Sequence, residues 1–225
     1  MLFNKKINLD NKIIVMDLDD TIYDENSFFN NGLDQVSRYL SKYLNKSYKG
    51  IYNDLLLINL EYDRDKIFNR YLDFNIKNKK KLISNCIQIY RYNNKIISPY
   101  PDAQKFLNLY KGKLFLVTDG NKKVQSHKVN LLKIKKYFKK IYITRRFGIR
   151  YEKPSLYCFK KILKTENSSW ENLCYIGDNP NKDFINLNKS GSITVRMLRG
   201  KYKKLKLNKL YDAKIKVYNF NQFLN

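Results

Sequence analysis

Three short apolar runs, each ending abruptly at polar residues, constrain most strongly what this chain can fold into. The runs occupy residues 13–16, 114–117 and 173–176, and the polar residues that follow them are Asp17, Thr118 and the pair Gly177-Asp178. Continuous apolar runs of this length are typical of strands buried on both faces, as in a parallel sheet. Helical periodicity separates the later runs, and this alternation predicts an α/β fold with a doubly wound, mostly parallel sheet. Further strands are expected at residues 141–143, 193–195 and 215–218, with a C-terminal helix at residues 219–224.

The region between the first and second runs has a different pattern. Residues 23–97 lack proline, and apolar residues recur at helical spacing within residues 36–44, 55–60, 67–72 and 82–90. A proline-containing segment, residues 98–102, ends the pattern, and Asp102 is expected to be the N-cap of the next helix. We therefore expect an α/β core formed by residues 1–21 and 98–225, with residues 22–97 inserted as a helical domain.

Polar residues at the ends of the expected strands form the candidate active site. Ligands of open α/β sheets bind beyond the carboxyl ends of the strands. The residues expected to converge there are Asp17, Asp19, Thr118, Lys153, Asp178 and Asp183. Clustered carboxylates repel one another and lose hydration, so a cation usually accompanies them, and an all-oxygen ligand set suits Mg²⁺.

This set of residue types is suited to phosphoryl transfer. A cation and the Lys153 ammonium together can neutralise a phosphate dianion and the charge of its transition state. One carboxylate can then attack phosphorus to form an aspartyl-phosphate, and another can protonate the leaving oxygen and later activate water. Gly120 fits a tight turn whose backbone N–H groups face the phosphoryl oxygens.

The same residues resemble the four motifs of the haloacid dehalogenase (HAD) superfamily. Residues 17–21, Asp-Leu-Asp-Asp-Thr, resemble motif I, DxDx[T/V]. Thr118 resembles the motif II residue, Lys153 the motif III lysine, and residues 177–183 motif IV, all in the family order. The helical insert resembles the cap of the subclass with an α-helical C1 cap. The resemblance implies a HAD-like, Rossmannoid core and a phosphatase, since the family's dehalogenases lack the second motif I aspartate.

The resemblance also implies roles at the metal and proton-transfer sites. Asp17 is expected to be the nucleophile and a Mg²⁺ ligand. Asp19 is expected to be the general acid/base, with its backbone carbonyl as a further metal ligand. Asp178 is expected to bind the metal, and Asp183 to support the metal site or orient Lys153.

The remaining implied roles concern the phosphoryl group. Thr118 and the backbone around Asp119 and Gly120 are expected to bind it. Lys153 is expected to pair with both the phosphoryl group and the nucleophile. The implied reaction is hydrolysis of a small phosphorylated metabolite, such as a sugar phosphate or nucleoside monophosphate, through an aspartyl-phosphate. A phosphomutase would use the same aspartates but return the phosphoryl group to its substrate.

The formal net charge of +25 leaves nucleic-acid binding as an alternative function. The basic residues are scattered, however, and no zinc-finger or RNA-binding signature surrounds them. The chain is also rich in Lys, Asn, Ile and Tyr throughout, so a compositional bias explains the charge more simply. We therefore favour a small phosphorylated substrate over a nucleic-acid partner.

The expected location is the cytoplasm. No apolar run approaches the roughly 20 residues that span a bilayer, so no membrane association is expected. Residues 1–10 lack the apolar segment of a signal peptide. The three cysteines show neither metal-ligand spacing nor a disulfide framework. The sequence does not define an oligomeric state.

Overall fold

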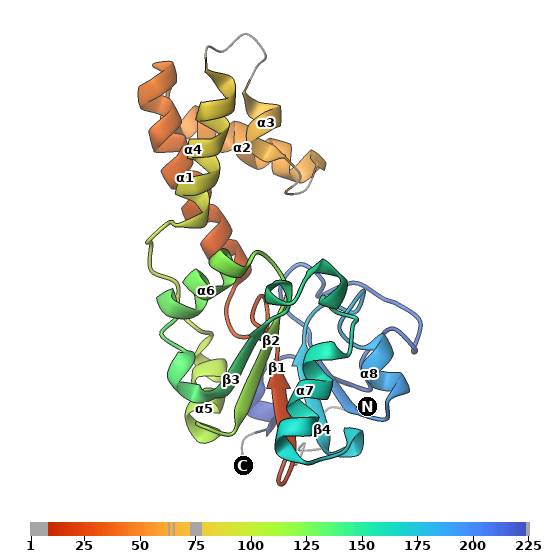
Figure 1. Ribbon diagram of the computed structural model, residues 1–225. Helices are drawn as coiled ribbons and strands as arrows, with labels where there is room; N and C mark the ends of the chain where they lie inside the picture. The colour runs from red at the N-terminus through yellow and green to blue at the C-terminus, as the bar shows by residue number, and fades with distance from the viewer. Residues whose placement is uncertain (1–8, 63, 65, 73–77, 224–225) are drawn as a thin grey trace. The chain divides into compact units, whose positions relative to one another are not determined.

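The computed structural model describes residues 9–62, 64, 66–72 and 78–223. The chain divides into two units, which Figure 1 shows in ribbon form. The core unit comprises Met1–Glu25 and Ile96–Asn225, and the insert unit comprises Asn26–Lys95. The expected bounds are residues 21 and 98.

The core unit is built on a six-stranded sheet in which every pair of neighbouring strands is parallel. The strands are β1 (Ile13–Met16), β2 (Leu114–Thr118), β3 (Phe138–Ile143), β4 (Leu173–Gly177), β5 (Ile193–Met197) and β6 (Ile215–Val217). Their order in the sheet is β3-β2-β1-β4-β5-β6. The chain first builds outward from β1 in one direction and then returns to build in the other. The expected doubly wound parallel sheet is therefore confirmed, and its switch point lies beside β1.

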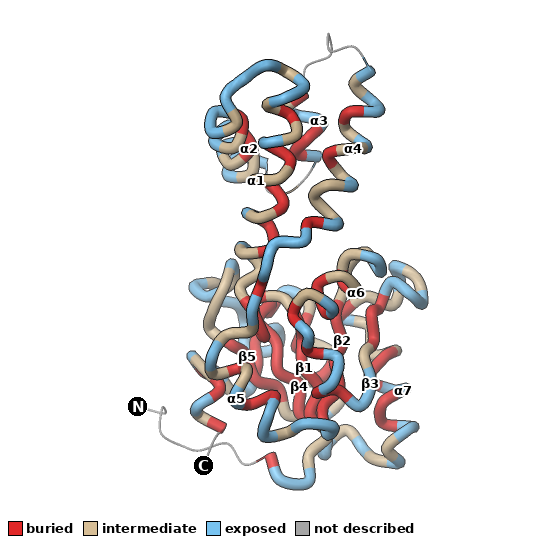
Figure 2. Tube along the Cα trace, turned by 90° about the vertical axis from the view of Figure 1, so that its left-hand side faces the viewer, coloured by how far each residue is buried: buried red, intermediate tan, exposed pale blue. Residues whose placement is uncertain are grey.

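Helices cover both faces of this sheet (Figure 1). On one face lie α5 (Pro101–Leu109) and α6 (Lys122–Leu131), and on the other lie α7 (Tyr157–Glu166) and α8 (Ile185–Lys189). Short 3₁₀ helices are η1 (Lys135–Tyr137), η2 (Thr144–Arg146), η3 (Ile149–Tyr151), η4 (Trp170–Asn172) and η5 (Phe220–Phe223). The central strands are almost entirely buried, as Figure 2 shows. Burial of both faces explains why these strands are continuous apolar runs in the sequence.

A hydrophobic cluster joins the sheet to α7 and α8. Phe159 and Ile162 of α7 are buried in it with Val15, Phe115 and Tyr175 of the sheet. Burial of such side chains contributes roughly 25 cal/mol per Å² of apolar surface removed from water. This packing fixes the carboxyl ends of β1, β2 and β4, from which the candidate site residues project.

The described residues of the insert unit form four helices, as the periodicity indicates. They are α1 (Glu25–Leu44), α2 (Tyr48–Tyr62), α3 (Ile67–Tyr71) and α4 (Lys79–Arg91). Their apolar faces form one cluster, to which α1 contributes Leu33 and Val36 and α4 contributes Leu82. Helices α1 and α4 approach closely at Gly32, where a Cβ atom would lie only 2.5 Å from the ring of Tyr90.

The expected N-cap of α5 is wrong. Tyr100 rather than Asp102 is the N-cap of α5, and Pro101 occupies the first helical position, for which its fixed φ angle is suited. The Asp102 carboxylate instead accepts hydrogen bonds from Arg199 Nη2 at 2.5 Å and Phe220 N at 2.7 Å. The expected short C-terminal helix is present as the 3₁₀ helix η5. Leu224 of its expected range, like residues 1–8, lies outside the described residues.

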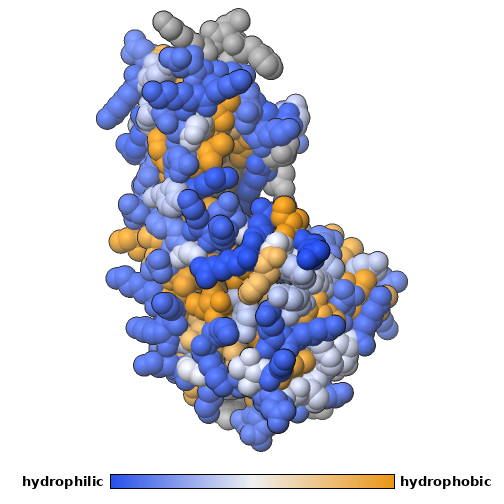
Figure 3. Space-filling model, viewed as in Figure 1, coloured by the Kyte–Doolittle hydropathy of each residue, from blue (hydrophilic) through white to orange (hydrophobic). Residues whose placement is uncertain are grey.

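Across the described residues, no helix combines the length and apolarity needed to cross a membrane. On the face drawn in Figure 3, hydrophilic residues predominate and apolar residues gather only in small groups. Cys86, Cys158 and Cys174 are buried free thiols.

Candidate active site

Asp17 and Lys153 form a buried ion pair where β1 ends. The Asp17 N–H donates to Ile176 O at 2.9 Å, which extends the pairing of β1 with β4 and fixes the position of the carboxylate. Lys153 Nζ lies 2.9 Å from Asp17 Oδ1, and the two side chains are 1% and 7% exposed. Burial alone would lower the pKa of Lys153, but the Asp17 and Asp183 carboxylates raise that pKa well above its ordinary value. Lys153 is therefore a fixed ammonium beside the Asp17 carboxylate.

Asp183 and Tyr175 complete the surroundings of Lys153. The ammonium lies 2.8 Å from Asp183 Oδ1 and donates to the Tyr175 hydroxyl, also at 2.8 Å. The other Asp183 oxygen, Oδ2, accepts from the backbone N–H of Asn179 at 2.9 Å. Gly177 makes room for this carboxylate, because a Cβ atom there would lie 2.5 Å from Asp183 Oδ2. Both Asp183 oxygens thus have protein donors, and the side chain holds Lys153 in place.

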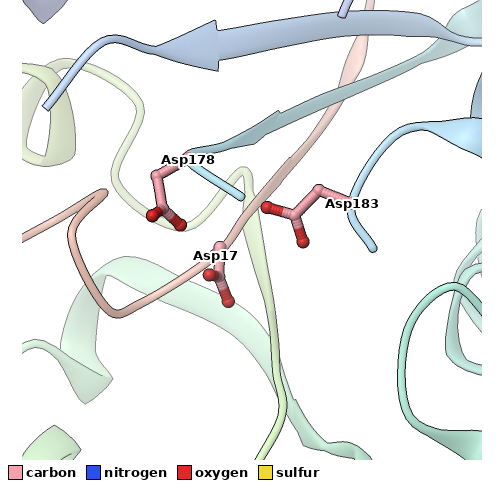
Figure 4. A group of neighbouring side chains, drawn as sticks. All are labelled: Asp17, Asp178 and Asp183. Atoms are coloured by element: carbon pink, nitrogen blue, oxygen red, sulfur yellow. The ribbon is translucent and has the colours of Figure 1, made fainter. Parts of the chain in front are cut away.

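Asp17, Asp178 and Asp183 gather three buried carboxylates at the ends of β1 and β4 (Figure 4). One oxygen from each lies within 4.8 Å of the others. Burial and the neighbouring Asp183 and Asp17 carboxylates raise the pKa of Asp178 well above its ordinary value. Burial also raises the pKa of Asp17 to about 7, although Lys153 opposes the shift. The protein's own cations therefore leave this cluster short of positive charge.

A divalent cation fits this cluster, and the partners of each carboxylate indicate which residues would bind it. Within the described part of the chain, the Asp178 carboxylate has no hydrogen-bond or ion-pair partner, although its residue is only 5% exposed. A buried carboxylate without a partner is costly unless it is neutralised. Asp17 and Asp178 are therefore the side chains suited to direct coordination. Asp183, whose oxygens are already paired, is suited to a supporting position behind Lys153.

The Asp19 carboxylate is not part of this cluster and has hydrogen-bond donors of its own. Its Oδ1 accepts from the Tyr23 hydroxyl at 2.6 Å and from Lys128 Nζ at 2.7 Å. Its Oδ2 accepts from Gln125 Nε2 at 2.9 Å. Burial would raise the pKa of Asp19, but Lys128, Tyr23 and Gln125 together lower it. In this arrangement Asp19 is a carboxylate with both oxygens engaged.

The Thr118–Gly120 turn brings the expected phosphate-binding groups to the same edge of the sheet. Gly120 has a φ angle of 120°, which favours glycine and supports the expected tight turn. The Asp119 carboxylate is committed to the protein, because it accepts from Thr144 Oγ1 at 2.8 Å and pairs with Lys182 Nζ at 2.9 Å. At Asp119, therefore, the backbone rather than the side chain is suited to binding a phosphoryl group. The Gly120 N–H currently donates to Glu152 Oε1 at 3.3 Å.

Four residues that the motifs did not single out also line this site: Tyr23, Gln125, Lys128 and Lys182. Gln125 and Lys128 are one turn apart in the helix after Thr118, so their spacing was the available signal. Lys182 is part of the segment that resembles motif IV, directly before Asp183. Its ammonium places a third lysine beside the carboxylates, together with Lys153 and Lys128.

Comparisons with known proteins show to which family this chain is similar. A family profile of haloacid dehalogenase-like hydrolases matches residues 14–196. Glyceraldehyde 3-phosphate phosphatase of Methanocaldococcus jannaschii is 29% identical over 214 residues, covering 91% of this chain and 92% of that protein. The enzyme of the same name from Pyrococcus furiosus is 26% identical over 209 residues, covering 87% and 84%.

A solved HAD-superfamily hydrolase from Geobacter sulfurreducens superposes with a TM-score of 0.67 at 15% identity, over 94% of this chain and 93% of that one. This likeness concerns the fold. The family match extends over most of the chain and includes every candidate site residue from Asp17 to Asp183. The chain therefore belongs to the haloacid dehalogenase-like hydrolases.

Proposed function

We propose that this HAD-type phosphatase hydrolyses a small phosphorylated metabolite with Mg²⁺, through an aspartyl-phosphate formed on Asp17. The observation that carries the proposal is the buried Asp17–Lys153 pair, at 2.9 Å, beside two further carboxylates. The proximity of these carboxylates to a fixed ammonium at one edge of the sheet supports Asp17 as the nucleophile and the cluster as the metal site. Asp19, two residues after the nucleophile, supplies the group for proton transfer.

In the first step, an oxygen of the Asp17 carboxylate attacks phosphorus. A new O–P bond forms, the bond from phosphorus to the leaving oxygen breaks, and the leaving oxygen takes a proton from Asp19. This step requires Asp19 to bind a proton when substrate is present, although Lys128, Tyr23 and Gln125 lower its pKa in the free protein. Lys153 favours the ionised form of Asp17 and offsets charge on the phosphoryl group. Thr118 and the backbone N–H groups of the turn that follows hold the remaining phosphoryl oxygens.

In the second step, water releases the phosphate. The Asp19 carboxylate takes a proton from the water, whose oxygen bonds to phosphorus while the bond from phosphorus to Asp17 breaks. Inorganic phosphate leaves and both aspartates return to their starting protonation states. The net reaction is the hydrolysis of one phosphate ester by one water molecule.

Asp17 and Asp178, with the backbone carbonyl of Asp19, would hold the Mg²⁺ ion. When bound, the ion supplies positive charge that neutralises the carboxylates and the phosphoryl oxygens. Asp183 stays with Lys153 in this assignment, because both of its oxygens already accept hydrogen bonds from the protein.

Glyceraldehyde 3-phosphate is the first substrate to test. Two relatives that align with more than four fifths of this chain carry that name. A triose phosphate also suits the role that we assign to the insert unit, that of a C1 cap which selects small substrates. Other sugar phosphates and nucleoside monophosphates form the comparison set.

The test measures phosphate release from glyceraldehyde 3-phosphate, glucose 6-phosphate and AMP, with Mg²⁺ or with EDTA. Variants are Asp17→Asn and, as a matched control, the exposed Asp10→Asn. We expect Mg²⁺-dependent release that Asp17→Asn abolishes and Asp10→Asn preserves. Folded wild-type protein that releases no phosphate from any of these esters would contradict the proposal. Conversion to an isomeric phosphate ester instead of release would identify a mutase.

A further inference from the structure

The Asp19 carboxylate lies in a set of donors that comes mainly from one helix, α6. We propose that Gln125 and Lys128 are positioning residues, which hold Asp19 in the orientation it needs to transfer protons to and from the reacting oxygens. The inference rests on the proposed function, in which Asp19 is the general acid/base. It adds to that function the residues that fix the position of the Asp19 carboxylate relative to the phosphoryl group.

Lys128 ties the segment after β1 to α6. Its ammonium lies 2.7 Å from Asp19 Oδ1 and 3.3 Å from Glu25 Oε1, and its side chain is only 6% exposed. Lysine is rarely buried unless it is paired, because the desolvation of its charge is unfavourable. The two carboxylates provide that pairing, and in return Lys128 fixes both ends of the segment from residue 19 to residue 25.

Gln125 connects the acid/base carboxylate to the expected phosphate-binding hydroxyl. Its Nε2 donates to Asp19 Oδ2 at 2.9 Å and to Thr118 Oγ1 at 2.7 Å. One amide group therefore fixes the separation of the two site residues. Because Thr118 Oγ1 accepts this hydrogen bond, its own proton remains available to donate to a phosphoryl oxygen.

The start of α6 fixes where these two side chains lie. Asn121 caps the helix, its side chain accepting from Lys123 N at 3.0 Å and Val124 N at 3.4 Å. The cap follows directly after Gly120 and so fixes the first turn of the helix next to Thr118. Residues three apart share a helix face, so the helix presents Gln125 and Lys128 to Asp19 together.

This arrangement predicts a selective defect when Lys128 is removed. Lys128 pairs with Asp19 and Glu25, which take no part in the attack on phosphorus, so phosphoryl transfer to Asp17 should persist. Only the steps that need a well-placed Asp19 should suffer, because general acid–base catalysis depends on hydrogen-bond geometry. Those steps are protonation of a poor leaving group and activation of water.

The experiment compares an alkyl ester, glycerol 3-phosphate, with 2,4-dinitrophenyl phosphate, whose leaving group departs without a proton. For Lys128→Met we expect kcat/KM to fall about 10²-fold with glycerol 3-phosphate but less than about threefold with the aryl ester. Slow hydrolysis of the intermediate should also give a burst of about one equivalent of dinitrophenolate. Lys128→Arg, which retains the charge, should restore most of the activity on glycerol 3-phosphate.

Lys122→Met is the matched control, because it removes a lysine from an exposed position of the same helix. Equal losses on both esters in Lys128→Met, or losses no larger than those in Lys122→Met, would overturn the inference. If circular dichroism shows that Lys128→Met is unfolded, Gln125→Met replaces it in the test, and the same selective loss on glycerol 3-phosphate is expected. A wild-type enzyme that turns over neither ester would contradict the proposed function. If the wild type is active and Asp17→Asn is inactive, but Lys128→Met shows no selective defect, only the inference is contradicted.

Discussion

The Lys153 ammonium pairs with two carboxylates at once: it lies 2.8 Å from Asp183 Oδ1 and 2.9 Å from Asp17 Oδ1. One lysine thus bridges Asp183 and Asp17, the proposed nucleophile. Among the cations that act on Asp17, Lys153 has the largest effect. The arrangement yields the following predictions.

Asp183→Asn should impair catalysis more than binding. The amide can still accept from Asn179 N but no longer offers Lys153 a charged partner, so the ammonium loses part of its orientation. Removal of a preorganised electrostatic contact typically lowers kcat about 10²-fold or more, and we expect a loss of that order. Steady-state kinetics check this, and an unchanged kcat would contradict the role given to Asp183.

Tyr175→Phe should have a smaller effect, mainly on stability. Its hydroxyl accepts from Lys153 and donates to Asp183 at 3.2 Å, so the substitution removes two buried hydrogen bonds. The free energy of unfolding should fall by about 1–3 kcal/mol, measured by urea denaturation. Tyr211→Phe, at an exposed position, is the control and should leave it unchanged.

Gly177→Ala should disturb both stability and activity. The new Cβ atom would lie 2.5 Å from Asp183 Oδ2 and 3.0 Å from a ring atom of Tyr175, both of which are held in place. Forced displacement in a packed interior typically costs about 1–3 kcal/mol, and here it would also move the partner of Lys153. Gly50→Ala, whose nearest neighbour is 3.8 Å away, should be neutral or stabilising, and equal effects at the two glycines would contradict the close-packing argument.

The Asp102–Arg199 pair should contribute stability that acid removes. Although burial opposes it, hydrogen bonds from Arg199 and Phe220 N lower the pKa of Asp102 below its ordinary value of 3.8. The unfolded chain therefore binds this proton first, so the contribution is fully present above pH ~4 and is lost as the pH falls through the lower, folded pKa. Unfolding curves from pH 7 to pH 3 should show a smaller acid-dependent loss in Asp102→Asn than in the wild type. Parallel curves would contradict this.

The fold was predictable from the sequence because burial on both faces leaves a simple signal. β1, β2 and β4 each combine a continuous apolar run with a polar residue at the carboxyl end. The sequence motifs also indicated Asp17, Lys153 and Asp183, which the structure brings into contact. In these cases local pattern and tertiary position agree.

The sequence did not reveal contacts that depend on where distant elements meet. Lys128 and Gln125 look like ordinary polar residues of an amphipathic helix until α6 packs beside Asp19, more than 100 residues earlier in the chain. Asp102 looks like an N-cap until Arg199 arrives from the far end of β5 and competes for its carboxylate. Lys128 and Gln125 were omitted because the sequence does not show which residue the helix face meets. The N-cap prediction for Asp102 was wrong because the sequence does not show its distant ion-pair partner.

The covalent intermediate is the most direct test of the account. Asp19→Asn should still transfer the phosphoryl group from 2,4-dinitrophenyl phosphate to Asp17 but should hydrolyse the product slowly. Acid quenching during turnover, followed by mass spectrometry of the peptide that contains residues 13–22, should therefore find a phosphoryl adduct on Asp17. An adduct on another residue, or none while dinitrophenolate is released in a burst, would contradict the assignment of Asp17 as the nucleophile.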